Sequence, residues 1–143
     1  MSDSERDRLK EILQNKSILR GDFTLASGKK SDYYIDARLT TLDAEGVNLA
    51  GSIFLEEIMK DNTITAVGGP TMGADPIVGS ILALSQIRGT PIPGFLVRKQ
   101  EKGHGTGKLI EGNLEAGDNA AIVEDVITTG GSVIKAIEAV RDK

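Results

Sequence analysis

The segment from Ala120 to Val140 constrains the fold more than any other part of the sequence. Residues 120–126 form a run typical of a buried strand, although Glu124 and Asp125 stand near its end. A turn of hydroxyls and glycines follows, and apolar residues then recur at helical spacing as far as Val140. A strand that passes through such a turn into a helix is typical of α/β folds with a parallel sheet.

Strand-like and helix-like segments also alternate along the rest of the chain. We expect strands at residues 63–67, 92–97 and 120–126, and helices around residues 9–13, 47–58, 75–84 and 133–140. The first of these strands should stop at Gly68, and Asp75 should cap the third helix with Pro76 in its first turn. The sequence therefore predicts an α/β fold over residues 1–143, a single domain with a mainly parallel central sheet flanked by helices.

Three unusual segments fall at the ends of the expected strands. They are residues 68–73, 98–108 and 124–132, and each is rich in glycine or in charged residues. Ligands of parallel α/β sheets bind outside the carboxyl ends of the strands. We therefore expect these three segments to converge on one site.

Composition and charge exclude several classes of partner. The net charge of -4 argues against a general nucleic-acid binder, and no apolar run reaches the roughly 20 residues of a membrane span. A polar N-terminus and the absence of cysteine favour a cytoplasmic location. The basic residues Arg98, Lys99, Lys102 and Lys108 nevertheless surround His104, with only Glu101 to oppose them. This local charge suggests a small anionic ligand, although a solvated charged loop would look the same.

The segment 122–132 has the residue types that a phosphate monoester needs. Its glycines allow close backbone approach, its hydroxyls donate hydrogen bonds, and the start of the following helix favours negative charge. The two carboxylates, Glu124 and Asp125, suit sugar hydroxyls beside the phosphate. A helix N-cap preceded by a solvated acidic pair remains the alternative. A P-loop is excluded because Leu109 follows Gly107-Lys108, and the glycines at 103, 105 and 107 lack the dinucleotide-binding spacing.

Three motifs together resemble a known family. Residues 122–132 resemble the phosphoribosyl pyrophosphate (PRPP) signature of type I phosphoribosyltransferases. Residues 23–36, from Phe23 to Asp36, and residues 97–105, ahead of Leu109-Ile-Glu-Gly112, resemble the orotate-specific branch. The motifs stand in the family's order across residues 18–141. The resemblance implies transfer of a phosphoribosyl group from PRPP to orotate in pyrimidine biosynthesis.

The resemblance also implies a role for each matching residue. The residues expected to bind PRPP are Arg98, Lys99, Lys102, His104, Glu124, Asp125, Val126, Ile127, Thr128, Thr129, Gly130, Gly131 and Ser132. Lys102, His104 and Asp125 are expected to be catalytic, and Thr128 to lie near orotate. Mg²⁺ is the implied cofactor, carried mainly by PRPP rather than by protein ligands. The family further implies a homodimer in which a mobile basic loop, about residues 99–112, reaches the neighbouring site.

The sequence also departs from the family pattern. Gly73 and Ala26 stand where some members have lysine, so we expect main-chain N–H groups to do more of the binding there. Members continue with further strands and an arginine that contacts the orotate carboxylate, so we expect the C-terminal part to be truncated. The N-terminal segment, about residues 1–40, is expected to recognise the base, with Tyr33 and Tyr34 interpreted as packing residues. A non-catalytic PRPP binder or sensor, and a transferase for another base, remain alternatives.

Overall fold

A computed structural model describes residues 3–100 and 108–143. The first half contains α1 (Asp3–Ile12), the π-helical turn η1 (Leu13–Ser17), β1 (Ile18–Thr24), β2 (Lys30–Ile35), α2 (Arg38–Thr41) and α3 (Ala44–Met59). The second half contains β3 (Ala66–Pro70), α4 (Asp75–Ile87), β4 (Gly94–Val97), β5 (Ile110–Gly112), β6 (Ala120–Ile122) and α5 (Gly131–Arg141). Strands and helices alternate through this second half, as the sequence predicts.

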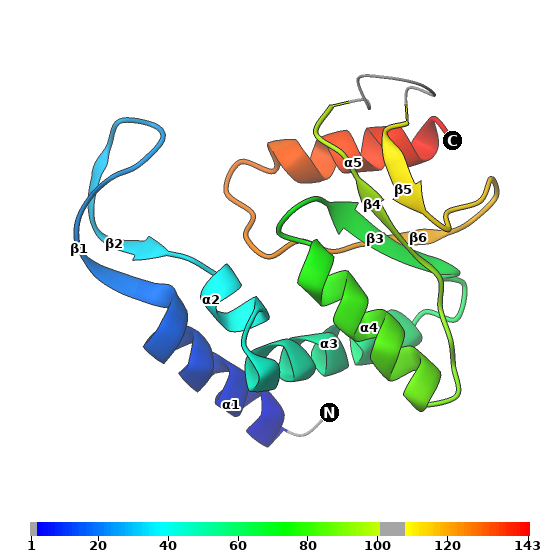
Figure 1. The fold of residues 1–143 in the computed structure, drawn as a ribbon, viewed down its shortest axis with the longest axis horizontal. Helices are drawn as coiled ribbons and strands as arrows, with labels where there is room; N and C mark the ends of the chain where they lie inside the picture. The colour runs from blue at the N-terminus through cyan, green and yellow to red at the C-terminus, as the bar shows by residue number, and fades with distance from the viewer. Residues whose placement is uncertain (1–2, 101–107) are drawn as a thin grey trace.

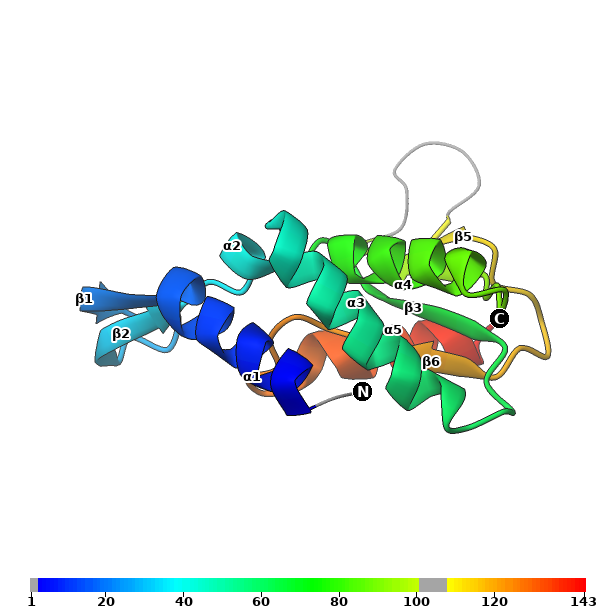
Figure 2. The same ribbon diagram turned by 90° about the horizontal axis from the view of Figure 1, so that it is seen from below.

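A four-stranded sheet lies at the centre of the fold, in the order β5-β4-β3-β6 (Figure 1). The strand β3 pairs in parallel with both β4 and β6, whereas β5 pairs antiparallel with β4. Helices α3 and α4 cover one face and α5 covers the other (Figure 2). The prediction of a mainly parallel sheet flanked by helices is confirmed.

Each face of the sheet has its own apolar cluster, because neighbouring strand residues point to opposite faces. Val67 packs with Leu55, Ile77 and Ile81 under α3 and α4. Its neighbour Ala66 packs on the other face. The other members of that second cluster are Phe95, Val97, Leu114, Ala136 and Ala139. The buried residues of both clusters are aliphatic apart from Phe95.

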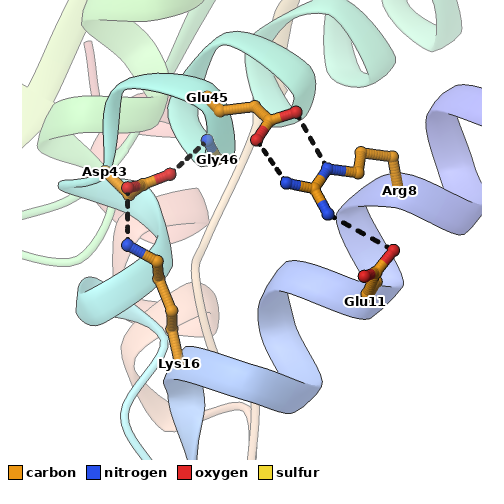
Figure 3. Close-up of polar contacts among 6 residues, drawn as sticks. All are labelled: Arg8, Glu11, Lys16, Asp43, Glu45 and Gly46. Atoms are coloured by element: carbon orange, nitrogen blue, oxygen red, sulfur yellow. Dashed lines mark hydrogen bonds and ion pairs between the residues drawn. The ribbon is translucent and has the colours of Figure 1, made fainter.

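An antiparallel hairpin, β1 with β2, extends away from the central sheet (Figure 1). Ion pairs fasten the helical segment before it to α3, since Arg8 contacts Glu45 at 2.7 Å and Lys16 contacts Asp43 at 2.8 Å (Figure 3). Asp43 also caps α3 by accepting a hydrogen bond from the Gly46 N–H at 2.8 Å. These contacts fix the base of the hairpin relative to the sheet.

The tyrosines of the hairpin pack against other side chains of the hairpin rather than in the core. Tyr33 and Tyr34 are 45% and 47% exposed. The Tyr34 ring meets Phe23 at 5.8 Å between centroids, and Arg20 lies over the Tyr33 ring. A two-stranded ribbon that stands off the sheet has no second layer to bury these rings.

The strand predicted at residues 63–67 instead spans Ala66–Pro70, so the prediction that it stops at Gly68 was wrong. Thr65 is drawn into polar contacts, with its hydroxyl 2.8 Å from Asp118 Oδ1. The glycines lie inside the strand because their surroundings leave no room for side chains. A Cβ on Gly68 would lie 2.5 Å from the Phe95 ring, and one on Gly69 would overlap the Val123 carbonyl oxygen.

Three other local predictions also differ from the structure. Part of the expected loop at residues 99–112 is the edge strand β5, where the Arg98 N–H donates to the Leu109 carbonyl at 2.7 Å. The strand expected at 120–126 ends at Ile122. Asp75 does not cap α4, because Ala74 occupies the cap position and Asp75 Oδ2 accepts a hydrogen bond from the Thr71 hydroxyl at 3.0 Å.

None of the helices within residues 3–100 and 108–143 combines the length and the apolar character needed to cross a membrane.

Candidate active site

The carboxyl ends of β3, β4 and β6 meet at one edge of the sheet because the three strands are parallel. The loop after β3 and the segment after β6 are in direct contact there. A Cβ on Gly73 would overlap Asp125 Oδ1 and would lie 2.7 Å from Glu124 Oε1. Arg98, just after β4, lines a hollow together with Pro70 of β3 and Ser132 of α5. The predicted convergence of three segments is therefore confirmed for their described residues.

Glu124 and Asp125 form an acidic pair at the exit of β6. The Asp125 N–H donates to Glu124 Oε1 at 3.0 Å, and the Val126 N–H donates to Asp125 Oδ1 at 2.8 Å. Partial burial, together with the hydrogen bond to the neighbouring Asp125 carboxyl, raises the pKa of Glu124 to about 7, against the opposing charge of Arg38. The pair is thus held by backbone donors at one place and can exchange a proton near neutral pH.

The turn between the acidic pair and α5 forms a small polar hollow. Gly130 adopts a φ of 86°, a left-handed conformation that favours glycine, and α5 begins at Gly131. The hollow has a volume of about 50 Å³ and is lined by Glu124 and residues 126–133. That volume accommodates about four water-sized groups, which matches the oxygens of one phosphate. The N–H groups in the first turn of a helix have no partner within the helix, so the start of α5 favours an anion.

The basic residues predicted to cover the site are only partly placed. Arg98 and Lys99 line the second, larger hollow of about 610 Å³, on the side of α5 that also carries Lys135. Arg98 forms an ion pair with Glu111, Nε to Oε1, at 3.0 Å. Lys102 and His104 lie outside the described residues. The structure therefore brings Glu124, Asp125 and residues 126–132 together and places Arg98 and Lys99 beside Ser132.

Arg38, which sequence reasoning missed, also belongs to this edge of the sheet. Its guanidinium Nη1 lies 3.4 Å from Met72 Sδ, in the loop after β3, and its charge acts on Glu124. Arg38 stands only two residues beyond the motif that ends at Asp36. Neither periodicity nor spacing indicates that α2 brings this residue back to the sheet.

Sequence relatives decide the family. The orotate phosphoribosyltransferase of Rhodopirellula baltica is 45% identical over 135 residues, which cover 91% of this chain and 70% of that protein. The orotate phosphoribosyltransferase of Rhodopseudomonas palustris (strain BisB5) is 46% identical over an alignment that covers 97% of this chain and 76% of the relative. The chain belongs to the orotate phosphoribosyltransferase family. It matches no protein-family model.

Solved structures of this family have the same fold. Orotate phosphoribosyltransferase of Mycobacterium tuberculosis H37Rv, in complex with Fe(III) dicitrate, superposes with a TM-score of 0.83 at 40% identity, over 96% of this chain and 77% of that one. The same protein in complex with PRPP gives a TM-score of 0.78 at 37% identity, over 96% and 75%. The chain spans about three quarters of the length of these relatives, and the α/β assignment is confirmed.

Proposed function

We propose that this chain transfers the phosphoribosyl group of PRPP to orotate, giving orotidine 5-phosphate and pyrophosphate. One observation carries the proposal: a carboxylate pair directly adjoins a phosphate-sized hollow at the start of α5. A sugar phosphate needs both groups side by side, one for its phosphate and one for its hydroxyls. Family membership supports orotate as the acceptor, because the relatives above are orotate phosphoribosyltransferases.

The hollow is proposed to hold the 5-phosphate of the donor. Thr128, Thr129 and Ser132 supply hydroxyl donors, while Gly130 and Gly131 let the backbone approach the phosphate oxygens. Val126 and Ile127 are 40% and 64% exposed, so their contribution comes from the main chain of the same turn. Thr128 is proposed to lie near orotate as well.

The acidic pair is proposed to hold the ribose hydroxyls. Backbone hydrogen bonds reach Glu124 Oε1 and Asp125 Oδ1, so the second oxygen of each carboxylate can accept a hydrogen bond from a hydroxyl. Binding both hydroxyls fixes the rotation of the ribose about the line from its 5-phosphate to C1. Orotate N1 then loses its proton and forms the new bond to C1 while the bond from C1 to the pyrophosphate oxygen breaks, and pyrophosphate leaves with the electron pair and takes up the proton.

Mg²⁺ fits this site as a cation carried by the donor. Among the described residues there is no group of three or more side chains that could hold a metal ion, although the two carboxylates provide oxygen ligands. Mg²⁺ commonly binds through one or two carboxylates together with substrate phosphates. When bound, it would neutralise part of the charge on the departing pyrophosphate. Arg98, Lys99, Lys102 and His104 are proposed to neutralise the rest and to exclude water.

A homodimer with shared sites is also proposed, and the hairpin supports it. Several apolar side chains of β1, β2 and α2 are exposed, namely Leu19, Tyr33, Tyr34, Ile35 and Leu39. An apolar surface of this kind is typical of contact with a ligand or with another subunit. We propose that residues 1–40 contribute to recognition of the base and that residues 99–112 reach the partner's site.

An orotate absorbance assay with PRPP and Mg²⁺ tests the proposal, with calorimetric titration of PRPP beside it. We expect orotate to be consumed only when both PRPP and Mg²⁺ are present. Turnover of adenine, hypoxanthine or uracil in place of orotate would reject the acceptor. Binding of PRPP with no turnover of any base would instead establish a non-catalytic binder.

A further inference from the structure

We propose that Arg38 binds the pyrophosphate group of the donor, on the side of the acidic pair opposite the 5-phosphate hollow. The inference rests on the proposed function and adds a binding residue to that site. Arg38 is exposed, and among residues 3–100 and 108–143 no carboxylate lies within ion-pair distance of it. Its guanidinium Nη1 donates to the sulfur of Met72 at 3.4 Å, which leaves its other N–H donors available to an anion.

The fold holds Arg38 at the site from a separate element. Arg38 is the first residue of α2, and its backbone N–H donates to Asp36 Oδ1 at 3.2 Å. Its neighbours Ala37 and Thr40 are buried, so α2 is anchored on either side of it. The guanidinium then reaches the loop after β3 at Met72, the residue before Gly73. Gly73 in turn lies against both carboxylates of the acidic pair, so the guanidinium stands on the loop that adjoins this pair.

Gly73 explains why the cation comes from α2. A Cβ at this position would overlap Asp125 Oδ1 and lie 2.6 Å from its Cγ, so the loop after β3 cannot carry a side chain here without displacing the acidic pair. The loop can still offer main-chain N–H groups. The positive side chain that reaches this loop comes from α2, since Arg38 Nη1 lies 3.4 Å from Met72 Sδ.

Geometry selects pyrophosphate rather than the 5-phosphate. The 5-phosphate hollow is lined by Glu124 and residues 126–133, and Arg38 is not among its lining residues. Arg38 instead contacts the loop after β3, which meets the acidic pair at Gly73. In PRPP the diphosphate on C1 and the phosphate on C5 lie at opposite ends of the ribose. If the acidic pair holds the ribose, the diphosphate falls on the side of Arg38, whose planar guanidinium suits bidentate binding of phosphate oxygens.

Calorimetric binding of two partial ligands tests this assignment. Two ligands are titrated separately: pyrophosphate together with Mg²⁺, and ribose 5-phosphate. Each is titrated into the wild type and into the variants Arg38→Ala, Arg38→Lys and Arg6→Ala. The last variant is the control, because Arg6 pairs with Glu57 between α1 and α3. We expect Arg38→Ala to weaken pyrophosphate binding about ten- to a hundredfold, as the loss of a charge-assisted contact does, while ribose 5-phosphate binding changes less than about twofold. Arg38→Lys should recover part of the loss, and Arg6→Ala should lose nothing.

Several results would overturn the assignment. The first is a wild-type protein that does not bind pyrophosphate. The second is an Arg38→Ala variant with the wild-type affinity for pyrophosphate. The third is a variant whose affinity for both ligands falls equally. A rise in the orotate KM with unchanged pyrophosphate affinity would place Arg38 at the acceptor instead. Because these titrations need no turnover, a protein that fails the orotate assay but passes them would reject the transferase and keep the role of Arg38.

Discussion

Glu124 titrates near neutral pH because the fold buries it partly beside Asp125. The folded pKa of about 7 exceeds the ordinary value of 4.5, so between these pH values the folded protein holds more protons than the unfolded chain. The contribution of this group to stability is therefore complete below about pH 4.5 and is lost as pH rises through 7.

Glu124→Gln should remove this pH dependence. We expect the Tm of the wild type to fall relative to that of the variant between pH 5 and pH 8, because only the wild type must ionise a half-buried carboxyl. Thermal unfolding of both proteins at the two pH values measures the difference. A Tm difference that is equal at pH 5 and pH 8 would show that Glu124 does not titrate in this range.

Asp125 is proposed to contact a ribose hydroxyl directly. Asp125→Asn keeps the shape of the side chain but removes its charge, so we expect PRPP binding or turnover to weaken at least about tenfold, which is roughly 1.4 kcal/mol for one charge-assisted contact. Steady-state kinetics and calorimetric titration with PRPP measure this loss of turnover or binding. Unchanged constants in a folded variant would remove Asp125 from the site.

At the scale of elements, the backbone of the loop after β3 lies against the side chains of the segment after β6 at the candidate site. Gly73→Ala should disturb this contact, because the added methyl group meets both carboxylates of the acidic pair. We expect kcat/KM to fall at least about tenfold while the protein remains folded, since a misplaced binding group weakens transition-state contacts.

Gly79→Ala is the matched control for that substitution. Gly79 lies in α4, is exposed, and has open space where a Cβ would stand. Alanine there should raise stability by about 0.5–1 kcal/mol and leave activity unchanged, because glycine is the poorer helix former. If both variants lose activity equally, the close contact at Gly73 is not what positions the acidic pair.

The sequence predicted the layers of the fold better than the bounds of its elements. Apolar periodicity identified α3, α4 and α5 because each helix buries one face. It misplaced β3, since Gly68 and Gly69 look like a turn until Phe95 and Val123 are seen to leave no space for side chains. Contacts between segments far apart in the chain are not encoded in local spacing.

The sequence also predicted the candidate site only in part. Residues 122–132 are contiguous, so their motif could be recognised directly, and the structure places Glu124 and residues 126–132 of this segment around one hollow. Arg38 is separated from Glu124 by most of the chain and has no motif of its own. Only the path of α2 between the hairpin and α3 reveals that it reaches the site.

At the scale of the whole molecule, the proposed dimer makes a quantitative prediction. Lys102→Ala and Asp125→Asn, each expected to be inactive alone, should complement each other when mixed if the basic segment serves the partner's site. A mixed dimer then has one site with both defects and one with neither. About half of the dimers are mixed, so about a quarter of wild-type activity should return under two-fold symmetry.

The activity of the mixture, with subunit exchange confirmed separately, decides between the two arrangements. If residues 99–112 serve their own subunit, every site keeps one defect and mixing restores nothing. That result would reject the shared site and leave the assignment of the orotate phosphoribosyltransferase family unaffected.

The proposed function depends most on the position of the phosphoribosyl group, and a crystal structure of this chain with bound PRPP shows that position directly. We predict the 5-phosphate in the hollow at the start of α5, contacting the main chain at Gly130 and Gly131, with the ribose hydroxyls on Glu124 and Asp125. A 5-phosphate found instead in the larger hollow beside Lys99 would contradict it.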